Sequence, residues 1–294
     1  MSRLLIFEDS AVLKAPVQNR NRISELGRQL AELISGRTSD DVTVIRAEDA
    51  LNTLRNRILE AQRQTAVIDF TDGVLSKELG CFDDIPILNL GLSRVKKLDD
   101  RLSGQGFLLR GDWNATTYID LSHPLLLDDV NWSGRSIIEV MNLLKINPQN
   151  CLVGNLTTNW GLFGDKKGGG NLLQNMGVTV LSGSNVNTPE DDGFHLEDFC
   201  VYSGQSLFQR KLSLDELRTL KQKGMFLDQA GLPKNGSAEF VINPNNLLMP
   251  SFKKRVTISD EEAIKAFLSF GERLNREIHI HDELNIETRT ELNL

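Results

Sequence analysis

Short apolar runs alternate with amphipathic segments along most of the first 186 residues. Runs of strand-like length lie at 4–7, 42–45, 65–70, 85–90, 125–127, 151–153 and 178–181. Apolar positions at helical spacing predict helices over 23–34, 50–59, 74–79 and 137–144, and a short one that ends at 176. Strands that alternate with helices favour an α/β fold with a mostly parallel sheet and helices on both faces. The continuous run at 125–127 is typical of a central strand covered on both sides.

Beyond about residue 187 the regular alternation ends. Two capping boxes, Ser213 with Glu216 and Ser259 with Glu262, predict two helices in this part, and a short strand is expected at 240–242. We therefore divide the chain into three parts. These are an N-terminal α/β extension that packs on the core (1–64), the core itself (65–186) and a C-terminal α+β appendage or hood (187–294).

The composition of the chain excludes some classes of function. The formal net charge of −7 disfavours broad nucleic-acid binding, which needs a surplus of Lys and Arg. Cys81, Cys151 and Cys200 are far apart and form no CxxC spacing, so we expect a reducing cytoplasm without disulfides or a zinc site. No apolar run approaches the roughly 20 residues that cross a bilayer. We expect a cytoplasmic protein with a small-molecule ligand, no membrane partner and a homodimeric state.

The most informative stretch is LLLDDVNWSGRSI at 125–137, an apolar run followed by two acidic residues and a small polar loop. A helix that begins near Gly134 leaves backbone N–H groups unpaired, and these groups, with the helix dipole, suit a phosphate. Gly134 lets the backbone approach closely, and Ser133 and Ser136 add hydroxyl donors. The loop therefore suits a phosphomonoester.

The two acidic residues suit a different part of the same ligand. Asp128 and Asp129 can accept hydrogen bonds from the two adjacent hydroxyls of a ribose, directly or through Mg²⁺. A phosphate on one side and a vicinal diol on the other describe ribose 5-phosphate. The alternative is purely structural, with the acidic pair as the polar end of a strand and SGRS as an ordinary helix N-cap.

The stretch resembles the phosphoribosyl pyrophosphate (PRPP) signature of type I phosphoribosyltransferases. In that signature an apolar run precedes two acidic residues, an apolar residue, two variable positions, and then a small residue, Gly, a variable residue and Ser or Thr. A second segment, KKGGGNLLQNMGV at 166–178, is similar to the part of orotate phosphoribosyltransferases where a charged pair and glycines lead into a short helix and a final strand. The resemblance spans about residues 65–185 and implies a parallel sheet with helices on both sides and a smaller hood over the base.

The resemblance also implies a reaction. Enzymes of this family exchange pyrophosphate at C1 of the ribose for a nitrogenous base, or run in reverse, with Mg²⁺ on the diphosphate. By resemblance, Asp128 and Asp129 are the catalytic residues and contact the ribose hydroxyls and the metal. The 5-phosphate would be held by five consecutive residues: Trp132, Ser133, Gly134, Arg135 and Ser136.

An earlier turn is the candidate for binding pyrophosphate. The family cradles the pyrophosphate in a loop after the first core strand, and Thr71, Asp72 and Gly73 occupy that place after AVIDF. Gly73 suits a close approach of the backbone, whereas Asp72 suits pyrophosphate only if a metal intervenes. An ordinary strand-to-helix turn is the alternative.

Two basic residues follow the strand at 85–90. Arg94 and Lys97 would neutralise the charge that accumulates on the diphosphate leaving group, and a solvated basic turn is the alternative. Between these residues and the signature, 98–118 has the length and the glycines of a mobile loop that closes over the site and excludes water.

Trp132 departs from the family pattern, because hypoxanthine-guanine enzymes have an Asp at this position and orotate enzymes a Thr. Tryptophan can stack on a base or narrow the site, or it can simply pack at the base of the loop. Two functions are consistent with the sequence. One is a Mg-dependent transferase that moves ribose 5-phosphate between pyrophosphate and a nitrogenous base. The other is a catalytically silent protein of the same fold, which binds PRPP or a nucleotide as a sensor.

Overall fold

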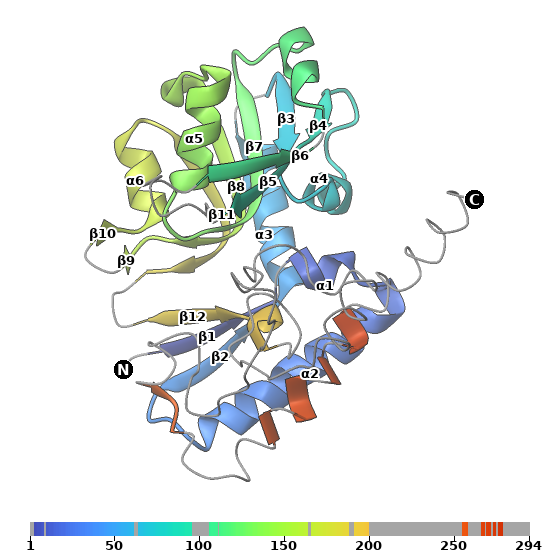
Figure 1. Cartoon of the computed structure of the whole chain (residues 1–294), viewed down its shortest axis with the longest axis vertical. Helices are drawn as coiled ribbons and strands as arrows, with labels where there is room; N and C mark the ends of the chain where they lie inside the picture. Colours follow the sequence, from blue (N-terminus) through green and yellow to red (C-terminus); the bar gives the residue numbers. More distant parts are fainter. Residues whose placement is uncertain are drawn as a thin grey trace, which may run out of the picture. The chain divides into compact units, whose positions relative to one another are not determined.

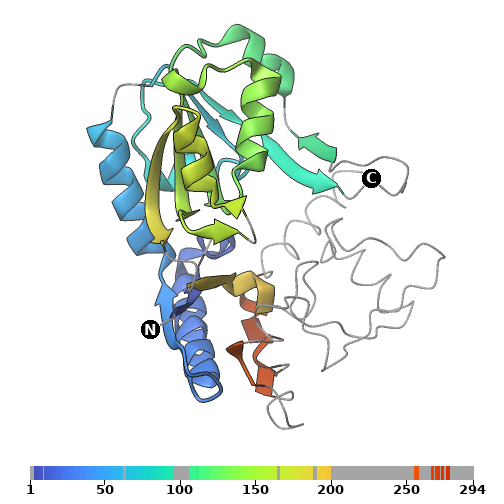
Figure 2. The same cartoon turned by 90° about the vertical axis from the view of Figure 1, so that its left-hand side faces the viewer.

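The computed structural model (Figures 1 and 2) describes most of the chain before residue 200 and a small part after it. The described residues are 3–8, 10–61, 64–95, 106–110, 112–163, 166–187, 191–199, 255–257 and, from 266 to 278, all but 268, 272 and 275. The predicted helix that starts at Ser213 and the predicted strand at 240–242 lie outside these residues, as does most of the expected appendage.

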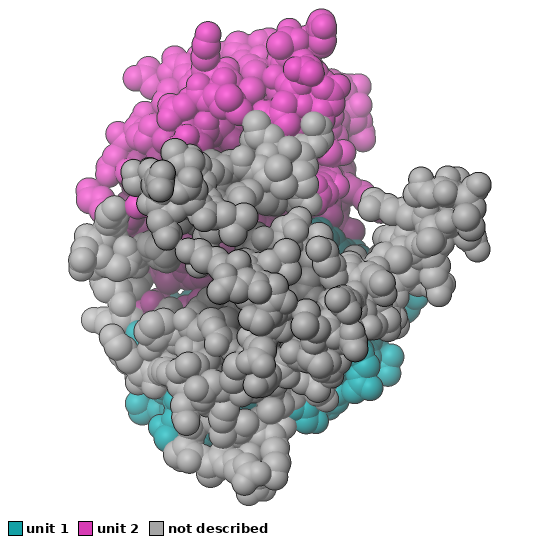
Figure 3. Space-filling model, viewed as in Figure 1, with its two compact units in different colours: residues 1–44, 95–104, 194–294 teal, residues 45–94, 105–193 magenta. Residues whose placement is uncertain are grey.

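The chain divides into two compact units (Figure 3). Residues 1–44, 95–104 and 194–294 form the first unit, and residues 45–94 and 105–193 form the second. The expected division at 64/65 and 186/187 stays a prediction.

The second unit is built on a five-stranded sheet (Figure 1). Its strands are β3 (Ala66–Asp69), β4 (Ile87–Asn89), β7 (Pro124–Asn131), β8 (Leu152–Asn159) and β11 (Thr179–Val186), in the order β11-β8-β7-β3-β4. Each neighbouring pair in this sheet is parallel. The α/β prediction with a mostly parallel sheet is therefore confirmed.

Helices cover both faces of this sheet (Figure 2). On one face lies α3 (Ala47–Glu60), whose Leu54 side chain is 3.5 Å from a Cβ built on Gly154 of β8. The short helix α4 (Val74–Leu79) contacts α3 and β3. On the other face lie α5 (Arg135–Leu144) and α6 (Gly169–Asn175). These two helices connect β7 to β8 and β8 to β11, as expected for parallel crossovers.

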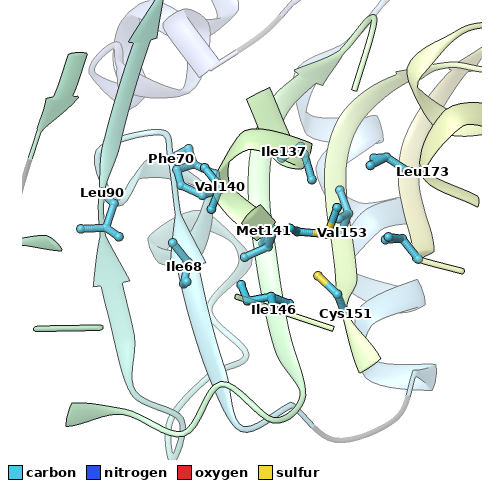
Figure 4. Close-up of a cluster of buried hydrophobic side chains, with 12 residues drawn as sticks. Ile68, Phe70, Leu90, Ile137, Val140, Met141, Ile146, Cys151, Val153 and Leu173 are labelled. Carbon is cyan, nitrogen blue, oxygen red and sulfur yellow. The ribbon is translucent and has the colours of Figure 1, made fainter. Parts of the chain in front are cut away.

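An apolar core fills the space between the sheet and α5 and α6 (Figure 4). Alternate residues of the strands point into it, because successive side chains of a strand face opposite sides. Burial raises the pKa of the Cys151 thiol in this core to about 12, so the thiol stays protonated. The buried members are Ile68, Phe70, Leu90, Leu126, Ile137, Val140, Met141, Ile146, Cys151, Val153, Leu173 and Val178.

The segment at 98–118, predicted as a mobile loop, contains regular structure where it is described. Strand β6 (Gly106–Arg110) pairs with β5 (Gly91–Val95), and a 3-10 helix, η1 (Trp113–Tyr118), follows it. Residues 96–105 and 111 lie outside the described residues. Short elements complete the second unit: η2 (Pro148–Asn150) and an antiparallel pair, β9 (Leu162–Phe163) with β10 (Lys166–Lys167).

The first unit has its own three-stranded sheet, in the order β12-β1-β2. Residues near the carboxyl terminus pack on its amino-terminal part: Arg255 pairs with Asp40 at 2.9 Å, and the Arg37 guanidinium lies 5.9 Å from the centre of the Phe267 ring. Its elements are β1 (Arg3–Phe7), α1 (Ser10–Lys14), α2 (Val17–Ser35), β2 (Asp41–Ile45), β12 (Asp192–His195) and η3 (Leu196–Phe199).

Among the described residues, the helices are all too short or too polar to cross a bilayer. The cytoplasmic location and the homodimer stay predictions.

Candidate active site

The order of the strands places a candidate ligand-binding edge at the carboxyl ends of β3 and β7. Along the chain, β3 is followed by β4 on one side of it and then by β7, β8 and β11 on the other, so the direction of winding reverses between β3 and β7. In open α/β sheets, ligands bind outside the carboxyl ends of the strands at such a point. Asp69 is in register with Leu127. The predicted segments 71–73 and 128–136 therefore leave the sheet at the same edge.

Asp128 and Asp129 are two half-buried residues in the last half of β7. The N–H of Asp129 donates to Asp128 Oδ1 at 3.0 Å, and the N–H of Val130 donates to Asp129 Oδ1 at 2.8 Å. The two carboxyl groups also hydrogen-bond each other.

The pKa of Asp128 is raised well above its ordinary value. Burial is the main cause, followed by the charge and the hydrogen-bonding carboxyl of Asp129; the charge of Asp69 adds to the effect, and the N–H of Asp129 opposes it. This edge therefore carries more negative charge than its own donors neutralise. Hydroxyl donors or a cation would relieve that excess, and perturbed carboxyl groups of this kind gather at functional sites.

The loop after β7 has the backbone of an anion site. Gly134 is the N-cap of α5 and has a φ of 71°, in the left-handed region. The N-cap is thus a glycine within SGRS, without a side-chain cap hydrogen bond, and the alternative of an ordinary helix N-cap stays open. Among the described residues the Ser133 hydroxyl is buried without a hydrogen-bond partner, while Ser136 is half-buried and Arg135 is exposed. The cap of α5, a helix of ten residues, has no side-chain hydrogen bond, and the N–H groups at the start of a helix suit an anion.

Trp132 is half-buried, and its carbonyl oxygen ties the loop to the start of α6. It accepts a hydrogen bond from the N–H of Gly169 at 2.8 Å. A Cβ on Gly168, Gly169 or Gly170 would overlap, respectively, the carbonyl of Asn159, the side chain of Asn131 and the ring of Trp160. Close packing thus requires glycine at all three positions. The segment at 166–178 therefore lies directly against the loop that follows β7, called the signature loop below (132–134).

Neutral polar side chains continue this edge onto β8. Asn131, 3% exposed, is in register with Thr158, 0% exposed. Among the described residues, the Asn131 amide, the Thr158 hydroxyl and Asn155 Oδ1 have no hydrogen-bond partner. A buried polar group left unpaired costs about 1–3 kcal/mol, so such groups are expected where a ligand or water completes the structure. The sequence signal for these residues was the polar run in NLTTN (155–159), directly after a strand that reads as apolar.

The turn after β3 is organised by Asp69, which is fully buried. Its carboxylate accepts hydrogen bonds from the N–H of Thr71 (2.8 Å), the hydroxyl of Thr71 (2.6 Å) and the N–H of Ser76 (2.7 Å). The Thr71 hydroxyl also accepts from the N–H of Leu75 at 3.0 Å, so this predicted ligand residue is engaged within the turn. Sequence reasoning did not single out Asp69, although an Asp two residues before a Thr at the start of a helix is a recognisable local cap.

Asp72 and Gly73 form the tip of that turn, with φ values of 56° and 83°. The Asp72 side chain is exposed. Asn89, at the end of β4, lies against Gly73 and was not singled out from the sequence. The backbone of Arg94 lies in β5, but its side chain and the whole of Lys97 lie outside the described residues.

Within the described part of the chain, no group of three or more His, Cys, Asp or Glu side chains is placed to hold a metal. Asp128 and Asp129 are thus a pair of potential metal ligands, and other ligands would have to come from a bound molecule or water.

Comparison with known proteins finds no matching family model and no matching curated protein. Among solved structures, the chain is similar to a purine phosphoribosyltransferase from Pyrococcus horikoshii Ot3, with 16% identity, a TM-score of 0.32, and 51% of this chain and 87% of that chain covered. A hypothetical protein from Neisseria gonorrhoeae with bound ppGpp has 17% identity, a TM-score of 0.32 and coverages of 51% and 81%. An orotate phosphoribosyltransferase from Aeropyrum pernix has 21% identity, a TM-score of 0.29 and coverages of 47% and 71%.

Proposed function

We propose that this protein is a phosphoribosyltransferase that transfers ribose 5-phosphate between pyrophosphate and a nitrogenous base. The observation that supports this most directly is the pairing, on one strand end, of the Asp128–Asp129 carboxyl pair with a glycine-capped loop at the start of α5. A vicinal diol and a phosphomonoester are the groups that these two features suit.

The residues would act by binding and orientation. The N–H groups of 133–136 would hold the 5-phosphate, and the two carboxyl groups would accept hydrogen bonds from the ribose hydroxyls. Burial and the neighbouring carboxyl groups raise the pKa of Asp128, and hydrogen bonds from the ribose hydroxyls would oppose that rise by stabilising the carboxylate. A ribose fixed at both ends presents C1 to the incoming base with little need for a protein nucleophile.

Mg²⁺ fits this arrangement. Two carboxyl groups that hydrogen-bond each other, with a third carboxylate near enough to raise the pKa of Asp128, form a site that a divalent cation would stabilise. Asp128 and Asp129 would hold it together with phosphate oxygens of the ligand, as is usual for Mg²⁺. When bound, the cation would supply charge neutralisation for the departing diphosphate.

The test is turnover of PRPP with Mg²⁺ by the full chain, over a panel of purine, pyrimidine and pyridine bases. We expect pyrophosphate release that depends on one class of base and stops when the metal is chelated. Absence of release with every base, combined with absence of PRPP binding in calorimetry, would contradict the proposal.

A second candidate function is a catalytically silent sensor of PRPP or a nucleotide. The observation that favours it is the exposed carboxylate of Asp72 at the turn where a diphosphate leaving group would bind. A sensor of a nucleoside monophosphate binds no diphosphate at this turn, so the charge of Asp72 would not oppose its ligand. Tight binding of PRPP or a nucleoside monophosphate without turnover of any base in the panel would favour the sensor over the transferase.

A further inference from the structure

A cavity of about 350 Å³ lies at the edge of the five-stranded sheet where the parallel strands begin, opposite the edge of the candidate active site. Its lining includes Leu152 and Thr179, the first residues of β8 and β11. His123, directly before β7, also lines it. From Pro124 to Asp128, β7 spans roughly 13 Å at about 3.3 Å per residue. The cavity is therefore separate from the candidate site for PRPP, and neither candidate function uses it.

The last turn of α3 brings two opposite charges to this cavity. Arg57 and Glu60 both line it, and because they are three residues apart, their side chains share one face of the helix. Arg57 Nη1 donates to the carbonyl oxygen of Ser182 at 2.7 Å, which holds the guanidinium group. Within the described part of the chain, Arg57 has no other side-chain hydrogen bond, Glu60 has none, and the two form no ion pair. Both side chains are exposed, so a ligand can reach both charges.

Neutral polar groups complete the lining of the cavity. The side-chain amides of Gln149 and Asn150 and the hydroxyl of Thr179 make no hydrogen bond within the described residues. The ring of His123 is hydrogen-bonded through Nδ1, to the hydroxyl of Ser122 at 3.3 Å, which leaves its Nε2 atom. These groups can donate to a ligand or accept from it without breaking a hydrogen bond of the fold.

The two charges and the size of the cavity indicate the class of ligand. Nε and Nη2 of Arg57 can bind a carboxylate through two parallel hydrogen bonds, and Glu60 suits an ammonium group. A phosphate-bearing ligand would be repelled by Glu60, and a purely cationic one by Arg57. The volume is at the lower end of the range of small-molecule sites, about 300–1,000 Å³, and Leu152 and Leu181 add apolar surface. A small zwitterion with an apolar part satisfies all these conditions.

We propose that this cavity is a binding site for a free α-amino acid, whose carboxylate is bound by Arg57 and whose ammonium group is bound by Glu60. The neutral groups of the lining bind the remaining polar atoms of the ligand. The inference goes beyond the transferase and the sensor and depends on neither, because the lining of the cavity includes no residue of 71–73 or 128–136.

The experiment titrates the protein amino acids, one at a time, into the full chain by calorimetry. We expect at least one of them to bind. Its α-amide and its N-acetyl derivative, which each lack one of the two charges, should bind about tenfold more weakly, the usual effect of one lost hydrogen bond to a charged group. Arg57→Gln and Glu60→Gln should each weaken binding of the free amino acid by a similar factor. Arg55→Gln, at an exposed arginine of α3 outside the cavity, is the matched control and should leave the affinity unchanged.

Glu60→Gln loses no hydrogen bond of the described structure, so it tests the inference even where Arg57→Gln, which alters the bond to Ser182, fails to fold. The inference is wrong if no amino acid binds, or if the amide and the N-acetyl derivative bind as tightly as the free amino acid. Wild-type affinity in Glu60→Gln would place the ligand elsewhere, and an equal loss in Arg55→Gln would point to net charge alone; either result also overturns the inference. None of these results concerns PRPP, so the inference and the proposed function fail separately.

Discussion

Asp69 and Asp128 are acidic residues at the same edge of the same sheet, on neighbouring strands, yet their carboxyl groups have opposite surroundings. Asp69 is fully buried and accepts three hydrogen bonds from Thr71 and Ser76. Asp128 is half-buried, and burial is the main cause that raises its pKa, to which the neighbouring carboxyl groups of Asp129 and Asp69 add. The two residues thus differ in how many hydrogen bonds from the turn or strand around them their carboxyl groups accept.

The difference separates a structural residue from a ligand residue. A carboxylate saturated by local donors has nothing to offer a ligand and holds the turn instead. A carboxyl group beside other carboxyl groups gains more from donors or a cation that a ligand brings, which is the condition expected of a binding site. Asp69 thus shapes the turn at 71–73, whereas in the proposed function Asp128 and Asp129 bind the ligand.

The largest effect is expected for Asp69→Ala. It leaves the N–H groups of Thr71 and Ser76 and the Thr71 hydroxyl without an acceptor. Each buried donor left unpaired costs about 1–3 kcal/mol, so we expect the free energy of unfolding to fall by about 4 kcal/mol, measured by urea denaturation. Hydrogen exchange of the Leu75 and Ser76 amides should accelerate as well. Asp69→Asn keeps one acceptor oxygen and should lose less, and equal losses for the two variants would contradict the role given to these bonds.

The next effect is on binding. Asp128→Asn combined with Asp129→Asn removes both anionic acceptors for the ribose hydroxyls and the cation, and we expect the affinity for PRPP to fall at least about 100-fold, close to 3 kcal/mol, in calorimetry. The matched control is Asp83→Asn with Asp84→Asn, two adjacent exposed acidic residues before β4 that give the same change of charge. Unchanged PRPP binding by the first double variant would contradict both candidate functions, and an equal loss in the control would point to net charge alone.

The smallest effect is a gain of stability. The folded state raises the pKa of Asp128, so folding favours the protonated carboxyl group. This contribution is fully present below the unfolded pKa of about 3.9 and is lost as the pH rises through the folded value. An asparagine at this position cannot ionise. At pH 7.5 we therefore expect Asp128→Asn to have a free energy of unfolding about 1 kcal/mol higher than the wild type in urea denaturation. Near pH 4 the two should be equal. A variant less stable than the wild type at pH 7.5 would show that the carboxylate is already neutralised by donors.

The apolar runs were sufficient to predict the positions of all five strands of the parallel sheet, but not where three of them, β7, β8 and β11, end. The predicted runs at 125–127, 151–153 and 178–181 continue as β7 to Asn131, β8 to Asn159 and β11 to Val186. The added residues are largely polar, and they stay in strands because the parallel ladder satisfies their backbone, with Val130 opposite Thr157 and Thr157 opposite Ser184. Side-chain bonds such as that between the hydroxyls of Thr157 and Ser184, at 2.8 Å, make this burial tolerable. A pattern of single-residue hydrophobicity cannot contain that information.

The candidate site also has a part that could be predicted from the sequence and a part that could not. The strand, loop and helix around Asp128 and Asp129 were predictable, because they are consecutive in the chain; the roles of these residues stay predictions. Asn89 was not predictable, because its contact with Gly73 exists only through the pairing of β4 with β3. Asn131 was not predictable either, since its neighbour Gly169 lies far along the chain at the start of α6.

The close packing of Gly168, Gly169 and Gly170, here called the glycine joint, limits which residues of this protein can change in evolution. Any side chain at these three positions meets a backbone carbonyl, a buried amide or an indole ring, so selection or laboratory evolution cannot adjust ligand preference there. Exposed positions such as Asn89 and Asp72 carry no such restriction. Divergence toward new ligands should therefore accumulate on the β3 and β4 side of the sheet, while the glycine joint stays fixed in every functional descendant.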